Sequence, residues 1–226
     1  MSLAQTSSPS LVLSSANLLL NGDLRSGSSL FPDYWRTEAW NQEPGVTSFD
    51  WLSHPDRPGE LRLVNHKPND ARWVQNLTLK PGWYYLSANI RTKNVPPTNQ
   101  GASLSILEDS VGSQDLRGDN EWRRVGFYLK VGPRGADIEV ACRLGGFSSL
   151  NTGTAWFSDI RVVPVKEVSP KNGPAFDLDE IRRQNATPPV GRPWTMFLVF
   201  AMTIGLAAVG WATFARSASA KQIDEM

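Results

Sequence analysis

The sequence predicts an all-β chain, an antiparallel β-sandwich or jelly roll, with one transmembrane helix added near the C-terminus. Three observations lead to this prediction. Apolar and polar residues alternate with a period of two along several segments, as in half-buried antiparallel strands. Clusters rich in Gly, Pro, Asn and Asp separate these segments. An uncharged run of 21 residues lies close to the C-terminus.

Composition limits the classes of protein that the chain can belong to. Its 226 residues are enough for one ordinary domain and a small addition. A net charge of +1 provides no overall field that attracts nucleic acid, so nucleic-acid partners are not expected. Nine Trp and nine Phe beside 18 Gly and 16 Pro fit a compact, turn-rich β domain and exclude disorder and a coiled coil. The single cysteine, Cys142, excludes an intramolecular disulfide and a cysteine-built zinc or iron–sulfur site.

The strands follow from the alternation and from the turns between them. Apolar side chains recur at every second position in residues 60–63, 124–131 and 137–144. Further strands are expected at residues 34–40, 47–52, 73–79, 83–93, 102–108 and 155–165. Turns are expected at residues 54–59, 80–82, 95–97, 118–120 and 132–135. The alternation predicts core positions for Leu63, Val125, Phe127, Leu129, Ile138, Val140 and Cys142.

Near the C-terminus, the run WTMFLVFAMTIGLAAVGWATF at residues 194–214 carries no charge. As a helix it spans about 31 Å, which matches the hydrocarbon core of a bilayer. Trp194 and Trp211 lie near its ends, where indoles favour the lipid headgroup zone. Small residues recur on one face and predict packing against a partner helix in lipid; they are Ala201, Gly205, Ala208, Ala212 and Ala215.

These elements divide the chain into five parts. Residues 1–16 form an N-terminal extension, residues 17–165 the jelly roll, and residues 166–193 a Pro-rich linker. Within the linker, Asp177 and Glu180 have the spacing of a capping box and predict a short helix. Residues 194–215 are the membrane helix and residues 216–226 a polar tail.

Four motifs resemble a known family. The run NLLLNGDL at residues 17–24, followed by Trp35, resembles the opening of jelly-roll carbohydrate-binding modules of the galactose-binding-like fold, of the type appended to xylanases. The runs KPGWYYLSA at residues 80–88, WRRVGF at residues 122–127 and GTAWFSDI at residues 153–160 resemble three later segments of these modules. The motifs occur in the family's order across residues 17–165. The fold that they imply hosts sugar binding, protein binding and purely structural roles.

The resemblance implies one cofactor and some buried aromatic side chains. Family members often hold a structural calcium between the first and last strands, and Asp23 and Asp159 lie where side chains of that site would be. This chain has Arg25 where the family commonly has an acidic residue, so the alternative is that both carboxylates accept hydrogen bonds from turn amides. Trp35, Trp122 and Trp156 match family positions that usually pack in the core. The faces of five other aromatics cannot be assigned from sequence; they are Phe49, Trp51, Trp73, Trp83 and Tyr85.

No catalytic constellation is visible, so the chain is not expected to be an enzyme. His54 and His66 lack metal-ligand spacing and are expected in solvated loops. No Gly-x-Ser-x-Gly elbow or phosphate-binding Gly loop occurs, and Cys142 alternates onto the core face.

Two functional hypotheses remain. In the first, the chain is a non-catalytic accessory or scaffold subunit whose membrane helix packs against other transmembrane subunits and whose jelly roll docks on the complex. In the second, it is a membrane-tethered, lectin-like module that holds a glycan at the cell envelope. The small-residue face and the short linker favour the first hypothesis.

Residues 1–20 carry no basic side chain and predict no secretory signal of the usual plan. The domain therefore either stays in the cytoplasm on a tail anchor or is exported by a route that these residues do not reveal. The family resemblance favours an extracytoplasmic domain with a short cytoplasmic tail.

Overall fold

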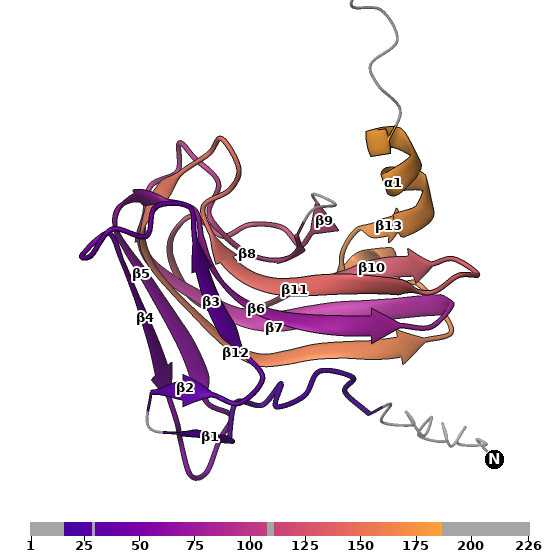
Figure 1. The fold of residues 1–226 in the computed structure, drawn as a ribbon, viewed down its shortest axis with the longest axis horizontal. Coiled ribbons are helices and arrows are strands. Elements are labelled where there is room, and N and C mark those ends of the chain that lie inside the picture. The colour runs from indigo at the N-terminus through magenta and orange to yellow at the C-terminus, as the bar shows by residue number, and fades with distance from the viewer. Residues whose placement is uncertain (1–15, 29, 108–110, 187–226) are drawn as a thin grey trace, which may run out of the picture. The chain divides into compact units, whose positions relative to one another are not determined.

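The structure, a computed structural model, describes residues 16–28, 30–107 and 111–186 (Figure 1). In this part of the chain two β-sheets pack face to face as a sandwich. The larger sheet has six strands in the order β13-β10-β7-β12-β5-β4. Its strands are β4 (Thr47–Leu52), β5 (Glu60–Asn69), β7 (Gly82–Val95), β10 (Gly118–Val131), β12 (Asn151–Val165) and β13 (Ala175–Asp177).

The smaller sheet has five strands in the order β3-β6-β11-β8-β9. Its strands are β3 (Arg36–Ala39), β6 (Ala71–Leu79), β8 (Ala102–Ile106), β9 (Val111–Gly112) and β11 (Ala136–Leu144). A separate two-stranded ribbon pairs β1 (Gly27–Ser28) with β2 (Phe31–Pro32). Among the described strands, the chain crosses from one sheet to the other after β3, β5, β6, β7, β9, β10 and β11, and only the β10–β13 pair is parallel. The predicted antiparallel β-sandwich is therefore confirmed.

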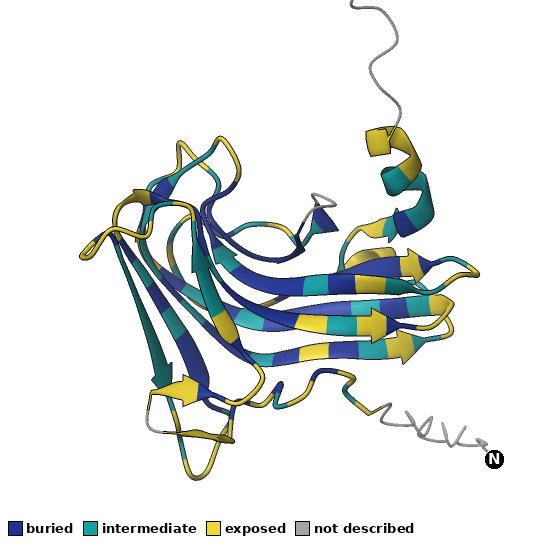
Figure 2. Cartoon of the chain, viewed as in Figure 1, coloured by how far each residue is buried: buried dark blue, intermediate teal, exposed yellow. Residues whose placement is uncertain are grey.

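The core fills the space between the two sheets (Figure 2). Its largest fully buried side chains include Trp73, Phe127 and Phe157. All seven side chains that the alternation assigned to the core are buried, including Cys142, whose exposure is 0%. Burial raises the pKa of the Cys142 thiol well above its usual value, so this cysteine behaves as a small apolar side chain.

The segment after β12 packs on the sandwich. A 3₁₀ turn, η1 (Pro170–Asn172), leads to β13, which pairs with β10, and then to helix α1 (Leu178–Ala186). The backbone N–H of Glu180 donates to Oδ1 of Asp177 at 3.2 Å, as expected for a helix N-cap. Leu178 is fully buried and Ile181 packs against the core. Burial of this apolar side of α1 holds the helix against the domain.

Two local predictions are wrong. Residues 118–120 were expected to form a turn, but they begin strand β10. The register against β7 shifts between Gly118 and Asn120, and Gly118 has a φ of 74°, so the turn-like residues form a bulge within a strand. His66 lies in β5 rather than in a loop, and its ring contacts the hydroxyl of Ser48 on β4 at 2.9 Å. The long β4–β5 pairing outweighs the local turn signals around His66.

Within residues 16–28, 30–107 and 111–186, no helix has the length and apolar character needed to cross a membrane. The predicted helix at residues 194–215 lies outside the described residues, together with Trp194, Trp211 and the small-residue face. These assignments stay predictions.

Candidate functional site

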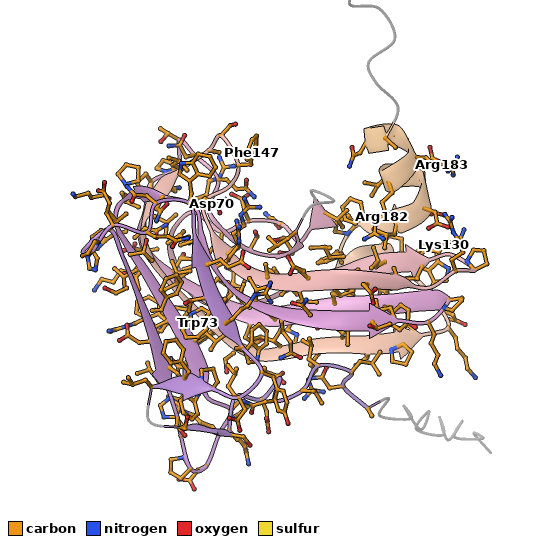
Figure 3. All side chains as sticks on the ribbon, viewed as in Figure 1. Asp70, Trp73, Lys130, Phe147, Arg182 and Arg183 are labelled. Atoms are coloured by element: carbon orange, nitrogen blue, oxygen red, sulfur yellow. The ribbon has the colours of Figure 1, made fainter. Side chains whose placement is uncertain are left out.

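The outer face of the five-stranded sheet, which we call the groove face, gathers polar side chains from four strands. They alternate along the strands with core residues such as Trp73, Leu104 and Cys142. The polar members are Arg36, Arg72, Asn76, Thr78, Ser103, Ser105, Asp137, Glu139 and Arg143. Helix α1 stands near one end of β11, and the loop that carries Phe147 follows its other end (Figures 1 and 3).

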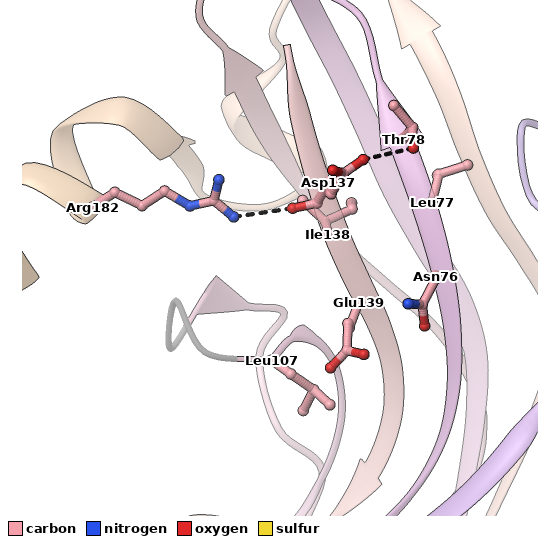
Figure 4. A pocket seen from close by; sticks show the side chains of 8 residues that line it. All are labelled: Asn76, Leu77, Thr78, Leu107, Asp137, Ile138, Glu139 and Arg182. Carbon is pink, nitrogen blue, oxygen red and sulfur yellow. Dashed lines mark hydrogen bonds between the residues drawn. The ribbon is translucent and has the colours of Figure 1, made fainter. Parts of the chain in front are cut away.

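Two hollows lie on the groove face. The first has a volume of about 360 Å³, and we call it the serine hollow; its wall includes Ser103, Ser105, Arg143, Phe147 and Phe176. The second has a volume of about 340 Å³, and we call it the helix hollow; its wall includes Asn76, Thr78, Leu107, Asp137, Glu139 and Arg182 (Figure 4). Leu107 follows β8 and packs with Val74 and Ala141 in a small apolar cluster separate from the main core.

Two serines with buried hydroxyls lie in the wall of the serine hollow. Ser103 and Ser105 are 2% and 6% exposed, and neither Oγ has a hydrogen-bond partner among the residues that the structure describes. They lie on the same face of β8 because they are two residues apart in a strand. A buried hydroxyl without a partner carries a cost of about 1–3 kcal/mol, which a bound polar ligand can remove.

An arginine and an aromatic ring complete this hollow. Asp70 holds Arg143 in a two-bond contact, with Nε at 2.6 Å from Oδ1 and Nη2 at 2.5 Å from Oδ2. Asp70 also accepts from Arg72 at 3.2 Å. Since the Asp70 side chain is only 6% exposed, this contact fixes the direction of the Arg143 guanidinium.

The Phe147 ring is 80% exposed because a tight turn lifts it away from the sheet. Gly146 and Ser149 exchange two backbone hydrogen bonds, of 3.1 and 3.0 Å, and leave Phe147 and Ser148 at the tip of the turn. The turn starts at Gly145, whose φ is +88° and where a Cβ would lie 2.3 Å from the Asn69 carbonyl oxygen. Only glycine fits this position.

The helix hollow is lined by paired polar groups. Arg36 contacts the carboxylates of Glu139 and Glu38 at 2.5 and 3.0 Å and donates to Asn76. Thr78 donates to the Asp137 carboxylate at 2.6 Å. Arg182 of α1 donates to the backbone oxygen of Asp137 at 3.1 Å, so the helix forms one wall (Figure 4).

Two carboxylates with lowered pKa hold segments that border the serine hollow. Burial alone would raise the pKa of Asp115, but hydrogen bonds from Arg117 and from the Gly101 amide lower it. The hydrogen bond from Lys130, at 3.0 Å, lowers the pKa of Asp177 and anchors β13, which carries Phe176. A lowered pKa in the folded state means that these contacts stabilise the domain near neutral pH and weaken as the pH falls through that pKa.

The structure places three of the aromatic side chains that the sequence left open: Trp73 is buried, and Phe49 and Trp51 pack against the core as partly buried rings. Trp35 is buried, as the family resemblance implied. The expectation that Trp122 and Trp156 are core residues is wrong. Trp122 is 37% exposed, and both indoles contact Arg91 on the outer face of the six-stranded sheet. In β12 the inward positions belong instead to Ala155 and Phe157, and in β10 a register shift precedes Arg123.

Asp23 and Asp159 lie in adjacent segments, as the family resemblance implies, because the Ile160 amide donates to the Gly22 carbonyl at 2.9 Å. Both carboxylates have arginine partners. Asp23 lies 3.6 Å from Arg25, and Asp159 lies 2.8 Å from both Arg124 and Arg161. The described residues contain no group of three or more His, Cys, Asp or Glu side chains that could hold a metal ion. The calcium assignment stays a prediction.

That assignment has a direct thermal test. If Asp23 and Asp159 help to bind calcium, a chelator is expected to lower the melting temperature, because an ion bound only by the folded state stabilises it by mass action. Circular dichroism during heating, with excess calcium and then with chelator, measures the shift. Asp23→Asn is expected to abolish the difference. Equal melting temperatures in calcium and in chelator would reject the site.

The sequence analysis did not single out Ser103, Ser105, Arg143 or Phe147. A signal existed for the two serines, since they alternate with Ala102, Leu104 and Ile106 in a predicted strand. No local pattern shows that their hydroxyls lack partners, or that Asp70 holds Arg143 from 73 residues away.

No protein-family model matches the chain, and no curated protein matches it in sequence. Several solved structures have a similar architecture. The enzymatically active domain of tailspike protein 4 of bacteriophage CBA120 is 13% identical, with a TM-score of 0.44; the match covers 66% of this chain and 21% of that one. This chain therefore spans about a fifth of the tailspike domain.

Two other similar structures are carbohydrate-binding modules. TmCBM61, solved in complex with beta-1,4-galactotriose, is 11% identical over 67% of this chain and 100% of its own, with a TM-score of 0.44. The CBM22-1 xylan-binding domain of Paenibacillus barcinonensis Xyn10C is 10% identical over 68% and 97%, with a TM-score of 0.40. The ligands named are those of the matched proteins.

Proposed function

We propose that this chain is a non-catalytic carbohydrate-binding protein that holds a glycan on its groove face. One observation carries the proposal: the wall of the serine hollow includes an exposed aromatic ring and two serines whose hydroxyls have no hydrogen-bond partner among the described residues. A hydroxyl both donates and accepts hydrogen bonds, so Ser103 and Ser105 can pair with sugar hydroxyls. The Phe147 ring offers a flat apolar surface for the C–H face of a pyranose.

Arg143, which Asp70 holds in one orientation, can donate hydrogen bonds to the glycan in fixed directions. Asp70 occupies one side of the Arg143 guanidinium, so the remaining N–H groups point in set directions before a ligand arrives. Preorganisation of this kind reduces the entropy that binding costs. The helix hollow lies further along the same sheet face. It supplies Asn76, Glu139 and Arg182, which can contact a second part of the same glycan.

This proposal corresponds to the second hypothesis of the sequence analysis. The first hypothesis, a membrane-bound accessory subunit, depends on residues 194–215, which lie outside the described residues, and it stays a prediction. The extracytoplasmic position that the sequence analysis favours for the domain stays a prediction.

The test is retention of the purified full chain, in mild detergent, on a panel of immobilised polysaccharides. Galactan and xylan are sensible first members, because similar domains have been described with such sugars. Phe147→Ala is expected to weaken the retained complex about tenfold, since loss of an aromatic contact costs about 1 kcal/mol or more. The Ser103→Ala/Ser105→Ala double variant is expected to weaken it by a similar factor.

Tyr34→Ala is the matched control. The Tyr34 side chain is 64% exposed and follows β2, at the opposite end of the sandwich from Phe147 (Figures 1 and 3). Its removal is expected to leave retention unchanged. If no polysaccharide retains the unaltered chain, the proposed function is wrong. If Phe147→Ala binds as well as the unaltered chain, the groove face is the wrong site.

A further inference from the structure

The outer face of the six-stranded sheet carries a second arrangement of aromatic and charged side chains. Arg91 of β7 pairs in register with Trp156 of β12. Its guanidinium carbon lies 4.3 Å from the centre of the Trp156 ring and 5.2 Å from the centre of the Trp122 ring of β10. The strands β10, β7 and β12 are neighbours in the sheet (Figure 1), so these three side chains form a row across it.

A hollow of about 310 Å³ opens beside this row. Its wall includes Arg57, Asn89, Trp122, Ser158, Asp159 and Arg161. The loop that carries Arg57 is held in place, because Ser158 donates to the Gly59 carbonyl at 2.7 Å and the Gly59 amide donates to the Asp23 carbonyl at 2.8 Å. The shape of this hollow is therefore set by hydrogen bonds within the sandwich.

Positive charge exceeds negative charge around the hollow. Two guanidiniums share Glu60: Arg57 lies 2.5 Å from its carboxylate and Arg91 lies 3.8 Å from it. Two more share Asp159, with Arg124 and Arg161 each at 2.8 Å.

Four arginines thus face two carboxylates. Of these four arginines, Arg57 and Arg161 are part of the wall of the hollow. The local excess of donors and of positive charge fits an anionic group.

We propose that this hollow is a second ligand site and that it binds an acidic sugar. In this site the carboxylate or sulfate of the sugar contacts Arg57 and Arg161, and the sugar ring lies against Trp122. A guanidinium can donate two parallel hydrogen bonds, and both a carboxylate and a sulfate offer two oxygen atoms that can accept them. The site is on the sheet opposite the groove face, so it is independent of the proposed function. With both sites occupied, one domain would hold two glycan chains.

The test is isothermal titration of the full chain in mild detergent with three defined ligands. They are trigalacturonate, a sulfated galactose disaccharide and neutral galactotriose. At least one of the two anionic ligands is expected to bind, and a rise in salt concentration is expected to weaken that binding. The tighter of the two identifies the preferred anion. Trp122→Ala and Arg161→Gln are each expected to weaken it at least about tenfold.

Arg123→Gln is the matched control, because Arg123 neighbours Trp122 in sequence, is exposed and has no ion pair among the described residues. It removes the same charge and is expected to change the affinity less than about twofold. The melting temperature of each variant shows whether it remains folded. The proposal is overturned if neither anionic ligand binds, if Trp122→Ala or Arg161→Gln leaves a folded protein with unchanged affinity, or if Arg123→Gln weakens binding as much as Arg161→Gln.

Phe147→Ala separates this site from the groove face. It is expected to leave binding of the anionic ligand unchanged. If instead Phe147→Ala abolishes anionic binding and Trp122→Ala does not, the acidic sugar occupies the groove face and the second site is rejected.

Discussion

Replacing Asp70 with asparagine is expected to lower the free energy of unfolding by about 3 kcal/mol. The Asp70 side chain is 6% exposed and lies between Arg143 and Arg72, whose side chains are 13% and 23% exposed. Removing the carboxylate leaves the poorly solvated Arg143 guanidinium without its anion, and this loss dominates the effect because Arg72 keeps Glu38 at 3.0 Å. Denaturant titration of the full chain, followed by tryptophan fluorescence, measures the change.

Asp50→Asn provides the control for Asp70→Asn. Asp50 pairs with Arg62 at 3.0 Å, but both side chains are more than a third exposed, so loss of this pair is expected to cost no more than about 1 kcal/mol. Equal destabilisation by the two variants would show that burial of Asp70 adds nothing. Because Asp70 also directs Arg143 into the serine hollow, Asp70→Asn is expected to weaken glycan retention, and Asp50→Asn is not.

Replacing Trp73 with alanine is expected to cost about 3–5 kcal/mol, the range for large aromatic side chains removed from a core. Trp73 is fully buried, and the rings of Phe31 and Phe49 meet its indole edge-to-face at 5.9 and 5.6 Å. Its Nε1 donates to the Arg62 carbonyl at 3.3 Å, which links the two sheets. The same denaturant titration measures the loss.

Trp40→Ala is the control for Trp73→Ala. It removes an equally large side chain that is 70% exposed, and it is expected to change stability by no more than about 0.5 kcal/mol. A stability change at Trp73 as small as that at Trp40 would mean that the core relaxes around the lost indole or that Trp73 is not where the structure places it.

Many of the strands could be predicted because the sequence patterns that indicate a strand lie within a few neighbouring residues. Residues 47–52 were predicted as a strand and form β4 with the same bounds. The alternation along β10 and β11 placed Phe127 and Cys142 in the core, where both are fully buried. The helix after Asp177 was predicted from a two-residue capping pattern. Each of these signals lies within a few residues and does not depend on which strand is the neighbour.

The candidate sites could not be predicted in the same way. Arg91 and Trp156 are 65 residues apart in sequence, and only the register between β7 and β12 makes them neighbours. The pattern around Trp122 is also ambiguous, because residues 118–124 are polar on both sides of the strand and a bulge shifts the register there. The family positions suggested burial for this indole, and the bulge instead leaves it exposed.

The sequence by itself determined the β class, most strand positions and the main core residues, because period-two alternation specifies one buried face for each strand. The tertiary structure decided which polar residues meet. It brought Asp70 to Arg143, left the Ser103 and Ser105 hydroxyls without partners among the described residues, and lifted Phe147 above the sheet. The physical reason is that strand pairing and the packing of two sheets fix register between distant segments, and no local pattern of side chains encodes that register.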